Sequence, residues 1–273
     1  MKRHLREVLL SVLVIALTVP IMPSLADTVD RVELGKVLKM IPDDGAPGEY
    51  GNVVYRRLAK KKGMAPVVFQ HWSHRARYTC RVCHLELEFS MRKGASQISR
   101  DKYLNGKFCG ACHNGKLAFS AAESAGECDR CHVENMAPLQ EMFERFAAGM
   151  PETETGNKID WAKALATGKI KPKHTIFSEE LSLQLPEKIA QPMSLGNAGS
   201  RSKVSFSHAE HFAEMDCSSC HPEIFNIKKK GTERFSMERN VYGIYCGACH
   251  MRVAFPMSDC RRCHPGMKNI RGV

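Results

Sequence analysis

All twelve cysteines of the chain belong to one short motif that occurs six times. In each copy two cysteines stand three positions apart, and a histidine follows the second cysteine directly. The cysteines are Cys80, Cys83, Cys109, Cys112, Cys128, Cys131, Cys217, Cys220, Cys246, Cys249, Cys260 and Cys263, and the histidines are His84, His113, His132, His221, His250 and His264. A pattern that uses every cysteine and always ends in histidine indicates a chemistry that needs both residue types together.

The Cys-x-x-Cys-His motif is the signature of covalent haem c attachment. Two thiols three positions apart lie on one side of a helical turn, so both can add to the vinyl groups of one haem. The imidazole of the next residue can then bind the iron as its proximal ligand. Thioether bonds also protect the sulfurs from oxidation outside the cytoplasm. The six copies therefore predict six covalently attached haems c.

Three other uses of paired cysteines fit the pattern less well. A disulfide framework would not require a histidine after every second cysteine. A zinc protein would combine Cys-x-x-Cys units into sets of four ligands, with no need for six identical histidine positions. A redox-active dithiol would occur once, near a βαβ pattern, rather than six times.

The sequence around these motifs is duplicated, with an offset of 137 residues (208 − 71) between the copies. Residues 69–113 match residues 206–250 at the haem motifs and at several positions between them. In each copy a His-x-x-His pair precedes the first haem motif. Two histidines about one helical turn apart can reach two different irons. We therefore interpret four histidines as distal iron ligands: His71, His74, His208 and His211.

Phe-x-His-x-x-His followed by three haem motifs resembles the cytochrome c3/c7 family, and more specifically the tandem trihaem c7-type cytochromes of metal-reducing bacteria. The resemblance covers two predicted trihaem modules, residues 66–135 and 203–273. It implies that the first histidine of each pair serves the first haem of its module, and the second histidine the next haem. The implied axial pairs are His71 with His84, His74 with His113, His208 with His221, and His211 with His250.

The sixth ligand of the third haem in each module stays open. Small members of the family supply a histidine shortly before the second haem motif, but neither module has a histidine between its first two motifs. Longer tandem relatives place a methionine there, which implies Met91 for the haem on His132 and Met237 for the haem on His264. Both methionines stand in a Phe-Ser-Met stretch, at different distances from the following cysteine. His174 is the rival candidate.

The first 26 residues have the layout of a secretory signal peptide: a basic start, an apolar run at residues 8–19, and a small-x-small site before Asp27. This layout predicts export to the periplasm, with the cell surface as a further possibility. No later stretch of the sequence is apolar over enough residues to cross a bilayer. We therefore expect that the protein is not an integral membrane protein. Residues 27–65 form an N-terminal segment that begins with a short helix and ends in a basic run.

Residues 136–202 form a connector with short helices between the modules. Apolar residues at helical spacing from Leu139 to Met150 predict an amphipathic helix. Asp160 can cap a second helix over 161–167, which Gly168 would end, and residues 176–202 read as extended chain. The expected fold is mostly irregular with small α content: two c7-like modules of short helices and loops around stacked haems, with little sheet, unfolded when haem is absent.

The chain is basic, with 40 Lys and Arg against 29 Asp and Glu. Without residues 1–26, the totals are 37 and 28, a net charge of +9. Six haems would bring twelve propionate charges, so the excess of basic residues is interpreted as compensation for the cofactor. No recognition motif accompanies the charge, and no nucleic-acid partner is expected.

Haems packed this densely, with both axial positions filled, predict an electron carrier and not an enzyme. The resemblance implies a role in anaerobic or extracellular electron transfer, with other cytochromes as redox partners. A multihaem reductase with one open haem iron is the first alternative, because the third haems have no assigned ligand. A docking subunit of a larger electron conduit is the second. The oligomeric state does not follow from the sequence.

Overall fold

The structure is a computed structural model that describes residues 34–92, 94–122, 125–177, 184–196, 203–226 and 235–267. The predicted signal region lies outside the described residues. A helix covers residues 34–40. The strands are β1 (Asn52–Tyr55), β2 (Val67–Gln70), β3 (Met193–Leu195) and β4 (Val204–Phe206). The further α-helices are α3 (Arg57–Lys61), α4 (His71–Arg75), α5 (Arg100–Leu104), α6 (Ala137–Ala147), α7 (Trp161–Ala166), α8 (His208–Phe212), α9 (Cys217–Cys220), α10 (Met237–Val241), α11 (Gly247–His250) and α12 (Cys260–Cys263).

These elements are short, and the two sheets have two antiparallel strands each. A π-helical turn at Val82–Glu86 and 3-10 turns at Phe108–Ala111, Ala125–Arg130 and Glu187–Ile189 add little regular structure. No helix of the described ranges is both long and apolar enough to cross a membrane. The expected fold class, mostly irregular with small helices and little sheet, is confirmed.

A β-hairpin leads into each His-x-x-His pair. In the first module β1 pairs with β2, and Phe69 lies opposite Val53. In the second module β3 pairs with β4, and Phe206 lies opposite Met193. The strand that ends each hairpin is followed directly by the helix that begins at the first histidine of the pair, α4 or α8. The structural repeat therefore includes residues of the predicted N-terminal segment and of the predicted connector.

A short helix with a serine cap precedes the second haem motif of each module. The hydroxyl of Ser99 accepts a hydrogen bond from the amide of Lys102 at the start of α5, and Ser236 does the same for Arg239 at the start of α10. Each helix packs closely on the haem motif that follows. A Cβ at Gly247 would lie 1.7 Å from the Asn240 carbonyl oxygen, so only glycine fits this position.

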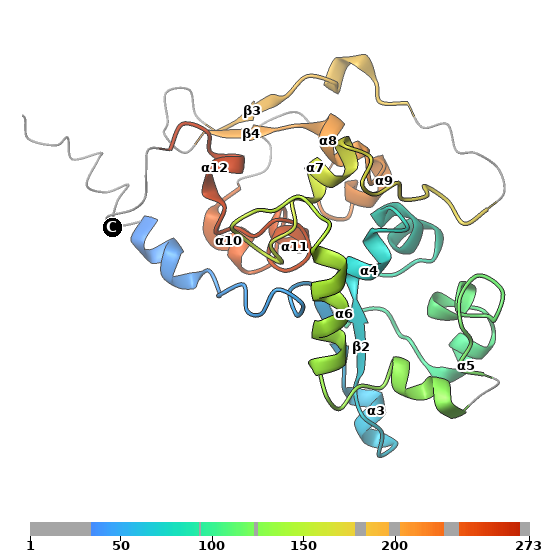
Figure 1. The fold of residues 1–273 in the computed structure, drawn as a ribbon. Coiled ribbons are helices and arrows are strands. Elements are labelled where there is room, and N and C mark those ends of the chain that lie inside the picture. The colour runs from blue at the N-terminus through green and yellow to red at the C-terminus, as the bar shows by residue number, and fades with distance from the viewer. Residues whose placement is uncertain are drawn as a thin grey trace, which may run out of the picture.

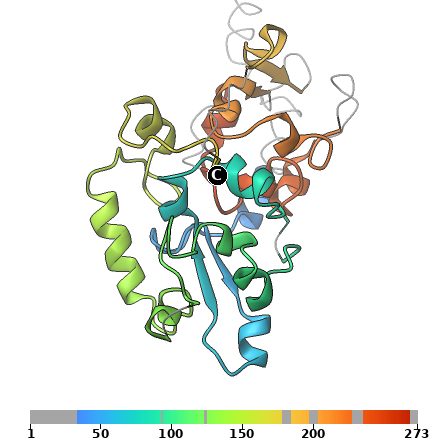
Figure 2. The same cartoon turned by 90° about the vertical axis from the view of Figure 1, so that its right-hand side faces the viewer.

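The connector packs onto the first module through a small aromatic core. Trp72 of α4, Phe143 of α6 and Trp161 of α7 are its large members, joined by Ile159, Ala164 and Ile170. Both predicted connector helices are present, and Asp160 caps α7 by accepting a hydrogen bond from Lys163. Between 184 and 196 the connector holds a 3-10 turn and β3. Figure 1 shows α6 beside α4 and β2, and Figure 2 shows the second module, in orange and red, next to the first.

Candidate functional site

Five of the six haem motifs form a single helical turn that positions their histidine. In each of them the histidine amide donates to the carbonyl of the first cysteine, four residues earlier, at 2.8–2.9 Å. The histidines concerned are His113, His132, His221, His250 and His264. The first motif differs, because the π-helical turn at Val82–Glu86 begins inside it. All twelve cysteine sulfurs are free of disulfide bonds.

His71 and His84 face each other, as the resemblance implied. Their ring centres lie 6.4 Å apart, and the ring planes differ by only 5°. The Nδ1 atom of His71 is 2.5 Å from the Gly51 carbonyl oxygen, and Nδ1 of His84 is 2.8 Å from that of Phe89. Because Nδ1 donates to the backbone, the lone pair of each imidazole is on Nε2 and is available to a metal.

Two further pairs have a similar spacing, but their ring planes are tilted, by 54° for His74 and His113 and by 66° for His211 and His250. The ring centres of His74 and His113 lie 6.2 Å apart, and those of His211 and His250 lie 6.1 Å apart. The Nδ1 atoms of these four histidines are also within hydrogen-bond distance of a backbone carbonyl, at 2.8–3.1 Å. The structure thus brings together histidines from α4 and α8 with histidines of the first and second haem motifs.

This spacing fits an iron held between two imidazoles. Metal–nitrogen bonds of about 2 Å on each side account for about 4 Å. The remainder of the 6.1–6.4 Å is the distance from nitrogen to ring centre in the two rings. The residues present therefore fit haem iron with two axial histidines. Bound haem would supply one-electron redox chemistry at these positions.

Burial keeps these imidazoles in the form that binds metals. Burial lowers the pKa of His71 and that of His250 to about 4, against the smaller effect of the carbonyl acceptors. Both rings are therefore neutral at neutral pH. A neutral imidazole is the ligand that iron requires.

The fourth implied pair is less complete. Burial lowers the pKa of His208, and the charges of His221 and His211 lower it further. No ring contact between His208 and His221 is found among the described residues. The Nδ1 atom of His221 is 2.6 Å from the Phe225 carbonyl oxygen. The buried Nδ1 of His208, by contrast, has no hydrogen-bond partner.

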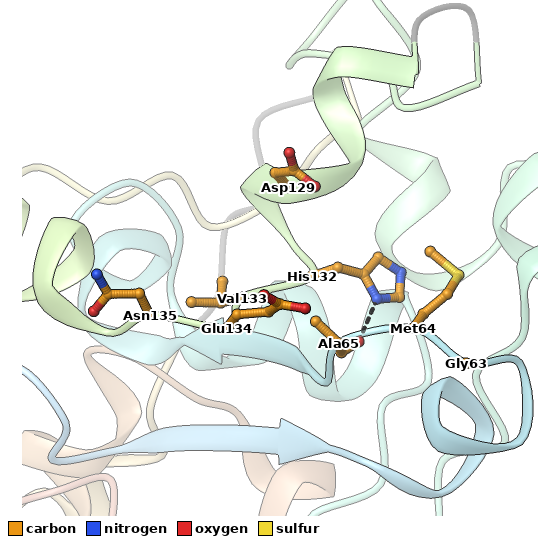
Figure 3. Close-up of a pocket in the computed structure, with 8 residues that line it drawn as sticks. All are labelled: Gly63, Met64, Ala65, Asp129, His132, Val133, Glu134 and Asn135. Atoms are coloured by element: carbon orange, nitrogen blue, oxygen red, sulfur yellow. Dashed lines mark hydrogen bonds between the residues drawn. The ribbon is translucent and has the colours of Figure 1, made fainter.

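The third haem motif of the first module opens on a cavity of about 540 Å³. The Nδ1 atom of His132 lies 2.6 Å from the Ala65 carbonyl oxygen, and Figure 3 shows Met64 beside the imidazole. The Nδ1 side of a proximal histidine points away from the iron. The Ala65 carbonyl is therefore on the proximal side of this site, and Met64 lines the same cavity.

The candidate ligands of the third haems are Met91, Met237 and His174. Among the described residues, no hydrogen bond or ring contact joins any of them to His132 or His264. His264 is buried, and its Nδ1 has no hydrogen-bond partner. Met237 is the first residue of α10, whereas Met91 lies in a bend. Since α5 and α10 occupy equivalent places, the structure matches Met237 with Arg100. The two Phe-Ser-Met stretches are therefore not equivalent in position, and the two methionine ligands stay predictions.

Sequence reasoning missed the carbonyl acceptors that orient the proximal histidines. Phe89 and Phe225 serve the first haem motif of each module, and Phe119 and Phe255 serve the second. Each Phe follows its histidine by four to six residues. The recurrence of an Ala-Phe pair after the second motif of both modules was the signal that could have identified the latter two.

Comparison with known proteins points to one family. The sequence profile described as "Cytochrome c7 and related cytochrome c" matches residues 67–133 and 204–265, one match in each predicted module. A solved c7-type three-haem cytochrome domain is 36% identical, with 34% of this chain and 96% of the domain covered and a TM-score of 0.26. The C-terminal hexahaem fragment of GSU1996 is 25% identical, with 78% of this chain and 96% of the fragment covered and a TM-score of 0.26. No curated protein is a significant match.

The N-terminal hexahaem fragment of GSU1996 is also similar, at 27% identity, with 80% of this chain and 99% of the fragment covered and a TM-score of 0.25. TM-scores of this size carry no argument about how the modules are arranged. The family assignment rests on the sequence matches and on the motifs in both halves. The chain is a multihaem electron carrier with two c7-type modules, and it belongs to the family of cytochrome c7 and related cytochromes c.

Proposed function

We propose that the chain binds six haems c and carries electrons in the periplasm or at the cell surface, in anaerobic or extracellular electron transfer. Each Cys-x-x-Cys-His motif holds one haem through two thioethers and a proximal histidine. His71, His74, His208 and His211 supply distal ligands to four of them. Its partners are redox proteins, other cytochromes among them.

The observation that carries this proposal is the set of three facing imidazole pairs, with ring centres 6.1–6.4 Å apart. An iron between two imidazoles has no position left for a substrate. It can still gain or lose an electron without exchanging a ligand. Such sites support electron transfer better than a reaction at the metal.

The proposed location rests on residues 1–26, whose basic start, apolar run and cleavage pattern are typical of a signal peptide. Haem c attachment fits this location, because twelve free thiols would oxidise outside the cytoplasm. The net charge of +9 for residues 27–273 is close to the twelve negative charges of six haems. The extracellular role follows the resemblance to cytochromes of metal-reducing bacteria.

Haem content tests the proposal most simply. Intact mass and the pyridine haemochrome assay should report six covalent haems on a chain that begins at Asp27. Haem that acid acetone extracts, or a count of four, would contradict the assignment of all six motifs.

The cavity at His132 favours a second candidate, a reductase with one open iron. It holds Asp129, Glu134 and Asn135 at its lining, polar groups that could contact a small substrate. Carbon monoxide distinguishes the two functions, because it binds only to an iron with an open position. The proposed carrier should bind none in its reduced state, whereas a reductase should bind one equivalent at the haem on His132.

Met237 is the proposed distal ligand of the haem on His264, and Met91 that of the haem on His132. A thioether favours ferrous iron, so the haem on His264 should titrate at a higher potential than its bis-histidine neighbours and show an Fe–S charge-transfer band. Met237→His should abolish the band and lower that potential, and Met237→Ala should open the iron to carbon monoxide. Met142→Ala, at an exposed methionine of α6, is the control. If the wild-type protein lacks the band and Met237→Ala binds no carbon monoxide, His174 is the next candidate.

A further inference from the structure

The two modules meet at a buried ion pair between α4 and the chain after α8. Arg75 contacts Glu214 through two atoms, with Nε 3.1 Å from Oε2 and Nη2 2.6 Å from Oε1. The side chains are only 17% and 15% exposed. Burial alone would raise the pKa of Glu214, but Arg75 lowers it overall, so the carboxylate stays charged. Trp161 of the connector lies 4.9 Å below the guanidinium.

A second buried ion pair joins the modules nearby. The Nε atom of Arg81 lies 3.1 Å from Oδ2 of Asp216, with side-chain exposures of 10% and 12%. The Arg81 amide donates to the Glu214 carbonyl at 3.1 Å. Arg81 also binds Glu86 of its own module and the carbonyl of His174 in the connector. Charges buried this deeply are costly unless their partners are in place, so the two pairs favour one relative position of the modules.

A haem-bearing cysteine of the first module lies at this contact. The Sγ atom of Cys80 is 3.3 Å from Oε2 of Glu214. Glu214 is the residue that pairs with Arg75, so the ion pair between the modules lies directly against the first haem motif of module one.

A separate contact brings the distal side of the same site to the second module. Gly51, whose carbonyl oxygen binds His71, packs against the second module: a Cβ there would lie 3.3 Å from the Arg252 carbonyl oxygen. The Tyr50 hydroxyl donates to the Ala254 carbonyl at 2.7 Å. Residues 252–254 directly follow the haem motif that ends at His250. The Gly51 end of the His71–His84 site thus lies against the chain that follows the His250 motif, and Glu214 of the second module lies against Cys80.

From this juxtaposition we infer that electrons cross between the modules from the haem on His84 to the haem on His250, or the reverse, held in place by the Arg75–Glu214 and Arg81–Asp216 pairs. The order of the chain would favour a different pair, the haems on His132 and His221, because these are consecutive in the sequence. The crossing is a one-electron exchange in which one iron is oxidised as the other is reduced, and no bond forms or breaks. The inference rests on the proposed hexahaem function.

Nuclear Overhauser effects in the fully reduced holoprotein test this directly, because low-spin ferrous haems are diamagnetic. Substituents of the haems on His84 and His250 should show cross-peaks to each other. Cross-peaks between the haems on His132 and His221, with none between the first two, would overturn the inference. A haem count on the same sample separates this failure from a failure of the hexahaem proposal itself.

Variants test the role of the ion pairs. Glu214→Gln leaves Arg75 buried without its charged partner, and the cross-peaks between the modules should weaken or vanish while those within each module persist. Arg75→Glu combined with Glu214→Arg restores opposite charges and should recover them. Glu127→Gln removes a charge from a more exposed pair within one module and should change nothing. Cross-peaks that survive unchanged in Glu214→Gln would show that the ion pair does not hold the modules together.

Discussion

Replacing His74 by alanine is expected to convert one haem from six-coordinate low-spin to five-coordinate high-spin. The imidazole of His74 faces that of His113 at 6.2 Å between ring centres, so its loss removes one axial ligand and leaves the proximal one. The reduced variant should then bind one equivalent of carbon monoxide. Spin-state spectra and a carbon monoxide titration measure these two effects. Each should report a change in one of the six haems.

His174→Ala is the matched control for this substitution. His174 is an exposed histidine of the connector. Arg81 donates a hydrogen bond to its backbone carbonyl and not to its imidazole ring. Its removal should leave every haem low-spin. A high-spin haem in the control would show that His174 is an axial ligand. No high-spin haem in His74→Ala would show that His74 is not.

The chain without haem is expected to be unfolded, a loss of its entire stability of about 5–15 kcal/mol. The described residues bury one small aromatic core around Trp72, Phe143 and Trp161. The haem motifs contribute half-buried cysteines and histidines instead of apolar side chains. The macrocycles must therefore supply most of the apolar contact inside each module, as six large planar groups that replace missing core.

Expression from Asp27 without haem attachment provides the sample, and the matured holoprotein is its control. Amide NMR spectra of the haem-free chain should be poorly dispersed, and circular dichroism should show no cooperative thermal transition. A cooperative transition in the haem-free chain would mean that the connector core alone sustains the fold.

The sequence predicted those parts of the site that depend on local spacing. The Cys-x-x-Cys-His turns, the amphipathic helix α6 and the Asp160 cap of α7 each depend on residues within about one or two helical turns. The pairing of His71 with His84 followed from the family resemblance and not from spacing alone. The structure places these rings opposite each other, with their centres 6.4 Å apart and their planes nearly parallel.

Contacts between distant segments could not be predicted in this way. Gly51, in the turn before β1, binds His71 twenty residues later, and Glu214 pairs with Arg75 across 139 residues. Neither contact leaves a periodic signal in the sequence. The two Phe-Ser-Met stretches show the same limit: at the constant offset of 137 residues, Met237 corresponds to Arg100 and not to Met91, so local resemblance did not mean equivalent position.

The ligation of all six irons is the central claim. Low-temperature EPR combined with near-infrared magnetic circular dichroism counts the haems with each pair of axial ligands directly. The oxidised wild-type protein should show four low-spin haems with two axial histidines, from the four His-x-x-His residues. The remaining two haems, on His264 and His132, should be low-spin with histidine and methionine, from Met237 and Met91. Fewer than four bis-histidine haems, or several high-spin irons, would contradict the claim that the chain positions its histidines to saturate the iron and carry electrons.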